Sequence, residues 1–124
     1  MLGSYSIENA HIMKYFHNPR CSKSRQGLEL LKENGVTPEI VFYLETPPTE
    51  KELADIIQKL GIKPIQLIRK TEKIFKEHFK GKDLSDKEWI QAMVKYPKLI
   101  ERPILIDKKR ASVGRPPENL LSLL

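Results

Sequence analysis

Cysteine is scarce in this sequence, and its scarcity limits the class of protein. Cys21 is the single cysteine among 124 residues, so no disulfide bond can form within the chain. A chain without an internal disulfide fits a reducing compartment, and we therefore expect a cytoplasmic protein. The length is that of one ordinary domain, which can bury a hydrophobic core without disulfide staples.

Long hydrophobic runs are also missing. No stretch reaches the roughly 18 consecutive apolar residues of a membrane-spanning helix, so we expect no membrane association. Residues 1–12 lack the basic start and apolar centre of a signal peptide, and we interpret them as an N-terminal extension, either unordered or a leader added in cloning. The single domain is expected over residues 13–124. The composition, with 40% apolar and 31% charged residues, is typical of a soluble globular protein.

Acidic residues are fewer than basic ones: the sequence has 16 Asp and Glu and 22 Lys and Arg, which gives a net charge of +6. The basic residues are dispersed, and the sequence has no long basic tract, no RNA-binding aromatic motif and no Cys/His spacing typical of a zinc site. We therefore expect neither nucleic-acid nor metal binding, whereas a small anion or an acidic protein remains a suitable partner. No coiled-coil seam is visible, so a monomer is expected.

The hydrophobic pattern predicts an α/β domain with a mixed four-stranded sheet, in which a β-α-β unit is followed by a helical insert and a β-β-α unit. The predicted strands cover residues 14–17, 39–44, 99–106 and 110–113. The predicted helices begin near Ser22, Thr49, Ser85 and Gly114, and two short helical pieces cover residues 64–68 and 72–79. One helix connects the first two strands, which favours a parallel pair, whereas a turn after the third strand favours an antiparallel hairpin for the last two.

The stretch that holds the cysteine, HNPRCSKSR at residues 17–25, carries the strongest functional signal. It lies between a predicted strand end and a predicted helix start, where unpaired backbone N–H groups and the helix dipole stabilise an anion. These features should lower the pKa of the Cys21 thiol and attract an oxyanion substrate. Arg20, Lys23 and Arg25 add positive charge. The alternative is a small buried hydrophobic side chain, against which the polar neighbours argue.

Five separated segments together resemble one family. They are YFHNPRCSKSR, FYLETPP, LIRK, KLIERPILI and GRPPENLL, and they follow in this order between residues 13 and 124. The chain resembles the ArsC-type arsenate reductases, the glutaredoxin-coupled branch of the thioredoxin-like fold, and looks most similar to the small members with a Cys-Ser-Lys-Ser site. The resemblance implies a thioredoxin-like fold, arsenate or a similar oxyanion as the ligand, and the reduction of arsenate to arsenite as the reaction.

The resemblance also implies roles for individual residues. Cys21 matches the nucleophile, and three arginines match the residues that bind the oxyanion and the arsenic intermediates: Arg69, Arg102 and Arg115. His17 matches a histidine near the thiolate. Pro103 matches a cis proline that precedes the third strand and faces the active cysteine. The first turn after the cysteine holds the other positions expected to contact the substrate: Ser22, Lys23, Ser24 and Arg25.

Each position also has an ordinary structural explanation. His17 could bond a backbone group, Arg69 could be a solvated loop charge, and Arg102 could pair with Glu101 on the surface. Pro103 could be trans, as most prolines are. The serines of the first helical turn fit turn formation and helix capping, with only backbone N–H groups facing the anion.

The electrons for a reduction must come from outside the chain, because Cys21 leaves no second thiol for an internal relay. The resemblance implies glutathione as the cosubstrate and glutaredoxin as the protein partner. The sequence has no metal, flavin or nicotinamide motif, so we expect no bound cofactor and a diffusing reductant.

Three other functions stay open. A regulator of the Spx type, which binds RNA polymerase, shares the fold but commonly carries Cys-x-x-Cys, where this chain has Ser24. A thiol oxidoreductase of the same family with another substrate is favoured by Arg20, because the best-known reductase has a small residue there, and by the differing pair Ser22-Lys23. A non-catalytic binding module predicts a thiol pKa near the free value of about 8.5.

Overall fold

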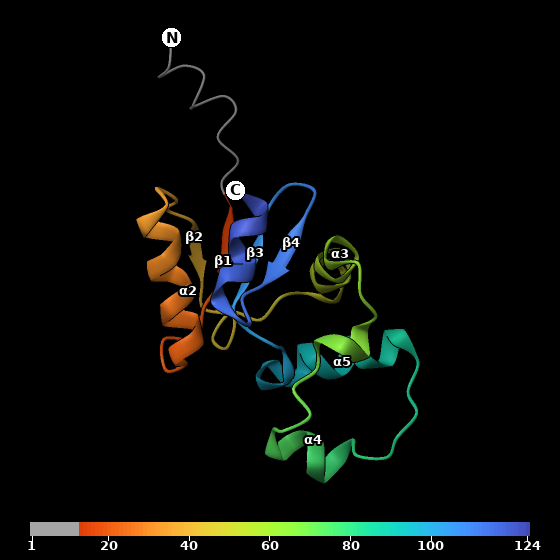
Figure 1. The fold of residues 1–124 in the computed structure, drawn as a ribbon. Coiled ribbons are helices and arrows are strands. Elements are labelled where there is room, and N and C mark those ends of the chain that lie inside the picture. The colour runs from red at the N-terminus through yellow and green to blue at the C-terminus, as the bar shows by residue number, and fades with distance from the viewer. Residues whose placement is uncertain (1–12) are drawn as a thin grey trace.

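The computed structural model describes residues 13–124, which form a mixed four-stranded sheet flanked by helices (Figure 1). The strand order is β2-β1-β3-β4, with bounds β1 (Lys14–Phe16), β2 (Glu39–Val41), β3 (Ile104–Ile106) and β4 (Ala111–Val113). β1 pairs parallel with β2 and antiparallel with β3, and β3 pairs antiparallel with β4. The predicted mixed sheet and C-terminal hairpin are therefore confirmed, whereas the prediction for residues 1–12 lies outside the described residues.

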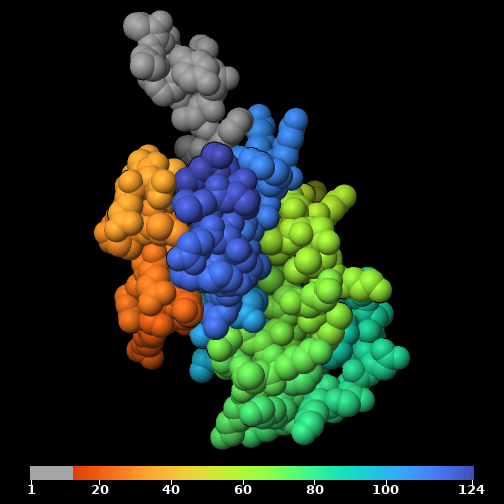
Figure 2. Space-filling model, in the orientation of Figure 1, coloured from red at the N-terminus to blue at the C-terminus, as the bar shows by residue number. Residues whose placement is uncertain are grey.

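The sheet separates two hydrophobic cores, because successive side chains of a strand point to opposite faces. On one face, Tyr15 and Leu105 pack with α2 (Ser22–Glu33) and the 3-10 helix η3 (Pro117–Leu123). Figure 2 shows η3, in dark blue, lying alongside α2, in orange. On the other face, Phe16 and Ile104 pack in a larger core with α3 (Glu50–Leu60) and α5 (Asp86–Lys95). None of the helices between residues 13 and 124 has both the length and the apolar character of a membrane span.

The helical insert between β2 and β3 is tied to the segment that precedes β3. It contains α3, η1 (Pro64–Leu67), α4 (Lys73–His78), α5 and η2 (Pro97–Leu99). Both predicted capping boxes are present: Thr49 with Glu52 starts α3, and Ser85 with Glu88 starts α5. Beyond η1, an antiparallel bridge joins Ile68 to Ile100. This bridge brings the end of the LIRK segment beside the KLIERP segment.

The second strand is shorter than predicted, because it ends at Val41 rather than at residue 44. The backbone N–H groups of Glu45 and Thr46 both donate to the Phe42 carbonyl oxygen at 2.9 Å, which closes a turn. The turn buries Tyr43, whose ring stacks on Phe16 with 5.6 Å between the centroids. Tertiary packing therefore overrides the β propensity of residues 42–44.

The third strand and the last helix also differ from the prediction. β3 covers only Ile104–Ile106, because residues 97–99 form η2 and Pro103 has no N–H to extend the ladder. The fourth strand starts at residue 111 rather than 110. The final helix is a 3-10 helix that begins at Pro117, and its period of three residues places Leu120 and Leu123 on the same buried face.

Gly27 is required where α2 crosses β1. A Cβ atom at this position would overlap the Tyr15 hydroxyl and lie 2.9 Å from Leu120 Cδ1. Overpacking costs about 1–3 kcal/mol, which exceeds the gain of roughly 1 kcal/mol that alanine offers in a helix. We predict that Gly27→Ala lowers the free energy of unfolding in a urea titration. The exposed neighbour Gln26 supplies the control, and equal stability of Gly27→Ala and Gln26→Ala would contradict the packing argument.

Candidate active site

Cys21 occupies the N-cap position of α2, with extended backbone angles φ −95° and ψ 122°. β1 ends at Phe16 and α2 starts at Ser22, so the cysteine lies in the strand-to-helix connection that the sequence predicts. Its side chain is partly exposed rather than sealed in a core. The alternative of a small buried hydrophobic residue is therefore wrong for this cysteine.

The surroundings of Cys21 favour its thiolate form. Partial burial raises the pKa of the thiol. The backbone N–H groups of Ser24 and Lys23 and the guanidinium group of Arg102 lower the pKa, and together they outweigh the effect of burial, so the net shift is downward. The two N–H groups belong to the first turn of α2, where the helix leaves donors unpaired. A lowered thiol pKa is the property that a nucleophilic cysteine needs at neutral pH.

Ser24 holds the Cys21 loop in place from inside the protein. Its side chain is fully buried, and its hydroxyl oxygen accepts from the Asn18 N–H at 3.0 Å and lies 2.7 Å from His17 Nδ1. Its carbonyl oxygen accepts from the Tyr15 hydroxyl at 2.6 Å. These bonds join the end of β1 to the first turn of α2. The Ser24 hydroxyl is thus used within the loop, and the backbone N–H is the group that faces the sulfur.

His17 is a neutral, buried member of this network. Burial, and then the charge of Arg25, lower the pKa of its imidazole. The ring lies between Tyr15 and Phe42, with centroid separations of 5.7 and 6.0 Å. Its polar partner is the Ser24 hydroxyl, rather than the backbone group considered from the sequence. In this structure His17 therefore contacts the loop that positions Cys21.

The other polar residues around the cysteine lie at the surface. Ser22, Lys23 and Arg25 are exposed on the first turn of α2, and Arg25 Nη1 donates to the Pro19 carbonyl oxygen at 2.8 Å. Arg20 is also exposed, and its backbone N–H donates to Asn18 Oδ1 at 3.0 Å. These contacts close the loop around the thiol and leave the side chains of the first turn facing solvent.

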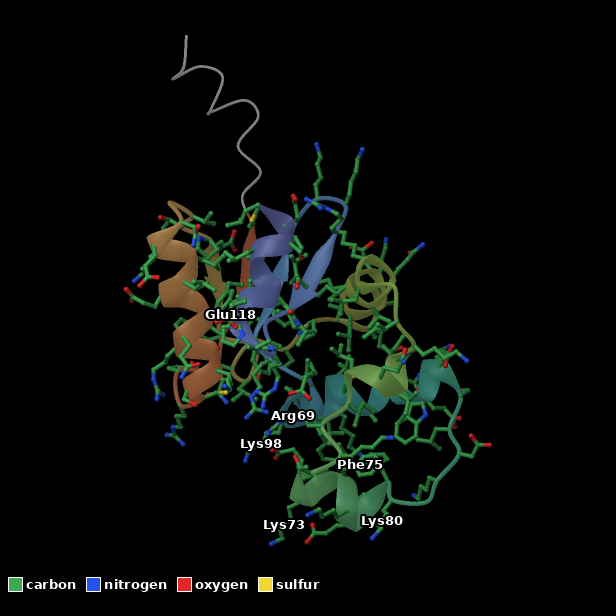
Figure 3. All side chains as sticks on the ribbon, viewed as in Figure 1. Arg69, Lys73, Phe75, Lys80, Lys98 and Glu118 are labelled. Atoms are coloured by element: carbon green, nitrogen blue, oxygen red, sulfur yellow. The ribbon has the colours of Figure 1, made fainter. Side chains whose placement is uncertain are left out.

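The three predicted arginines come together although they are distant in the sequence. The bridge beyond η1 places Arg69 beside residues 99–101, because the Arg69 N–H donates to the Leu99 carbonyl oxygen at 2.7 Å. Arg115 Nη1 donates to the carbonyl oxygen of Arg102 at 3.3 Å. Arg102 is also near Cys21, because its guanidinium group is one of the causes that lower the pKa of the thiol. Figure 3 shows Arg69 where the insert meets the end of the sheet.

Two carboxylates that the sequence did not reveal hold this arginine cluster. Glu101 Oε1 is buried and lies 3.5 Å from Arg69 Nε and 3.4 Å from Arg115 Nε. Glu72, the N-cap of α4, pairs with Arg69 Nη1. The ion pairs of Glu101 are thus with Arg69 and Arg115, not with its neighbour Arg102. The ion pair of Arg69 with Glu72 could have been predicted from their three-residue spacing. The partners of Glu101 could not, because they come from distant segments that only the tertiary structure brings together.

Arg102 has an uncommitted buried donor. Its Nε atom is buried, and no atom of residues 13–124 accepts a hydrogen bond from it. A buried donor without a partner is costly, so it suits an anion that is bound at the site. The unpartnered donor thus belongs to the same side chain that helps to lower the pKa of the Cys21 thiol.

Tyr43 is a further buried neighbour that sequence reasoning missed. Burial raises the pKa of its phenol to about 12, while the charges of Arg102 and Arg69 lower it and those of Cys21 and Glu101 raise it. The phenol is therefore neutral at physiological pH. All four charged groups influence the pKa of Tyr43, which places the turn after β2 near the site.

Pro103 lies directly after Arg102, and the peptide bond between them is cis. The bond has the geometry that the resemblance implied. The proline is buried, and its carbonyl oxygen accepts from the Gly114 N–H at 2.8 Å. A second cis bond, between Arg115 and Pro116, was not predicted. Among residues 13–124, no group of three or more His, Cys, Asp or Glu side chains could hold a metal ion.

Comparisons with known proteins identify the family of this chain. The model of the ArsC family matches residues 16–123, and the chain belongs to this family. It is 49% identical to the "Uncharacterized protein YfgD" of Escherichia coli K12, over 90% of this chain and 96% of that one. It is 43% identical to the arsenate reductase of Neisseria meningitidis, over 90% and 97% of the chains. The solved arsenate reductase of Vibrio cholerae is 43% identical, covers 90% of this chain and 97% of its own, and superposes with a TM-score of 0.86, so the fold is thioredoxin-like.

The Ser24 network gives a testable prediction. Ser24→Ala removes the acceptor of the Asn18 N–H and leaves that partly buried donor unpaired, at a cost of about 1–3 kcal/mol. We expect faster amide hydrogen exchange over residues 17–25, measured by mass spectrometry. Ser22→Ala, on the exposed side of the same turn, is the control and should exchange like the wild type. Unchanged exchange in Ser24→Ala would show that the network does not hold the loop.

Proposed function

We propose that this protein reduces arsenate to arsenite, with Cys21 as the nucleophile and external thiols as electron donors. One observation carries the proposal: a partly exposed thiol, whose pKa Arg102 helps to lower, lies at a cluster of arginines that includes Arg69 and Arg115. A nucleophile beside several guanidinium groups suits attack on an oxyanion.

The names of several relatives support the same substrate. The proteins of Neisseria meningitidis and Haemophilus influenzae, at 43% and 41% identity, are both named arsenate reductase. The solved protein of Vibrio cholerae carries the same name. These relatives match almost the whole described chain, so the proposed activity concerns the entire domain.

The first step joins Cys21 to arsenic. Arsenate is an anion, so a thiolate that approaches it meets like charge, which the guanidinium groups offset. Arg102 Nε and the N–H groups of the first turn of α2 are the proposed donors to its oxygens. The sulfur forms a bond to As(V) and one As–O bond breaks, so that the oxygen leaves as water after protonation. The product is a covalent thioarsenate adduct.

The second step takes electrons from glutathione. The glutathione sulfur attacks the Cys21 sulfur, the S–As bond breaks, and its electron pair reduces As(V) to As(III), which leaves as arsenite. Cys21 then carries glutathione in a mixed disulfide, and glutaredoxin removes that glutathione by thiol exchange. Cys21 is the only cysteine, so the chain itself cannot supply a resolving thiol. Glutathione acts as a cosubstrate, and its reducing pool makes the cytoplasm the proposed location.

A second candidate is a thiol oxidoreductase that acts on another substrate, such as a glutathione mixed disulfide. The carboxylates of Glu72 and Glu101 lie against the arginines and offset part of their charge. This offset weakens the attraction for a multiply charged oxyanion compared with three unpaired arginines. The thiol chemistry of Cys21 is the same in both candidates.

A coupled assay tests the proposed function. The protein is mixed with glutathione, glutaredoxin, glutathione reductase and NADPH, and NADPH loss is followed with and without arsenate. We expect arsenate-dependent loss that Cys21→Ser abolishes and that Ser122→Ala, at an exposed position of η3, leaves unchanged. Turnover by Cys21→Ser would remove the mechanism, whereas wild-type activity on a glutathione mixed disulfide without any response to arsenate would favour the second candidate.

Arg102 gives a sharper prediction within the same assay. Arg102→Lys keeps the charge but loses the flat guanidinium fork and its Nε donor. We expect kcat/KM for arsenate to fall about 10- to 100-fold, as for the loss of a hydrogen bond to a charged group. Arg110→Lys is the control, because Arg110 is exposed and bonds the carbonyl oxygens of the C-terminal segment. Equal activity of both variants would exclude Arg102 from substrate binding.

A further inference from the structure

A hollow lies on the helical insert, and Cys21 is not among the residues that line it. Its volume is about 640 Å³, and its floor includes the buried rings of Phe75 and Trp89. Five exposed lysines line it, and we call them the lysine surface: Lys63, Lys70, Lys76, Lys80 and Lys82. Among residues 13–124 none of these five forms an ion pair. Two aspartates, Asp83 and Asp86, also line the hollow, so the balance of charge is positive.

The lysine surface is joined to the proposed active site. Lys70 follows Arg69 in the chain, and Glu72, which pairs with Arg69, is the N-cap of α4. The helix that carries Lys76 is therefore anchored to the arginine cluster. In Figure 3, Lys73 projects from the start of α4 and Lys80 from the turn that follows it, and Lys98 appears on the side of α4 that faces Arg69. Basic side chains thus extend from the arginine cluster along the insert.

The charge pattern distinguishes this hollow from the other large one. The hollow between the sheet and α3 is lined by lysines and by a larger number of carboxylates, which include Glu39, Glu52, Asp55 and Asp107. Of these two hollows, only the one lined by the lysine surface has a clear excess of positive charge. Solvated lysine ammonium groups act over about 8 Å at physiological ionic strength and attract an extended surface of opposite charge.

The chemistry of the hollow favours an acidic protein over a nucleic acid. Single-stranded nucleic acids bind basic grooves in which aromatic rings stack on the bases. Here Phe75 and Trp89 are only 8% and 5% exposed, so their faces are covered by the protein core. Exposed lysines in a hollow whose own aromatic lining is covered suit carboxylates on a folded partner.

We propose that the lysine surface docks an acidic face of the thiol protein that regenerates Cys21. This inference rests on the proposed function, because it requires the mixed disulfide between Cys21 and glutathione. The partner's thiolate attacks the glutathione sulfur, the bond to Cys21 breaks, and Cys21 leaves as a thiolate. The glutathionyl group moves to the partner, so one disulfide is exchanged for another without a further oxidant.

A thiol-exchange experiment tests the docking without arsenate. Cys21 is first converted to its glutathione mixed disulfide, and the rate constant of its reduction by glutaredoxin is compared with that of reduction by dithiothreitol. The test variant is Lys76→Glu with Lys80→Glu. The matched control is Lys108→Glu with Lys109→Glu, which makes the same change of charge on the turn between β3 and β4.

We expect the Lys76→Glu, Lys80→Glu variant to react with glutaredoxin about three- to tenfold more slowly than the wild type at low salt, with a smaller dependence on ionic strength. Its reaction with dithiothreitol and the behaviour of the control variant should match the wild type. Equal slowing in both variants, unchanged glutaredoxin rates, or no preference of the wild type for glutaredoxin would overturn the docking.

A lysine-dependent shift of single-stranded RNA in a gel, with unchanged thiol exchange, would assign the surface to RNA instead. Failure of arsenate reduction alone would leave this result intact.

Discussion

The hydrogen bonds that converge on Ser24 are the constraint on which the candidate site depends. They join Tyr15, which lies in β1, and His17, which follows β1, to the first turn of α2 across the loop that carries Cys21. Because Ser24 is fully buried, its bonds are shielded from water and hold the loop in one arrangement. The sulfur then faces the backbone N–H groups of α2, which are the donors that stabilise its negative charge.

The second constraint is the cluster of charges that reaches the sulfur from remote segments. Glu101 lies between the guanidinium groups of Arg69 and Arg115, while the charge of Arg102 helps to lower the pKa of the Cys21 thiol. The carboxylate reduces the repulsion between the arginines and holds two of them beside the third. Glu72 continues the cluster into α4, so the insert that carries the lysine surface is fixed to the site. One set of ion pairs thus connects the proposed chemistry and the proposed docking surface.

The sequence predicted well those features that depend on local patterns. The strand, the cysteine loop and the start of α2 follow from a short apolar run and a polar stretch, and the capping boxes at Thr49 and Ser85 follow from three-residue spacings. Features set by tertiary packing were not predicted. The strand that ends at Val41 does so because Tyr43 turns into the core, and Glu101 pairs with arginines from two other segments.

The pKa of the Cys21 thiol tests the central claim most directly. It is obtained from the rate of iodoacetamide alkylation as a function of pH, because only the thiolate reacts. We predict that the rate rises and levels off below the free thiol value of about 8.5, and that Arg102→Gln moves the transition to higher pH by removing a positive charge. A transition at or above about 8.5 in the wild type, unmoved in Arg102→Gln, would contradict the account.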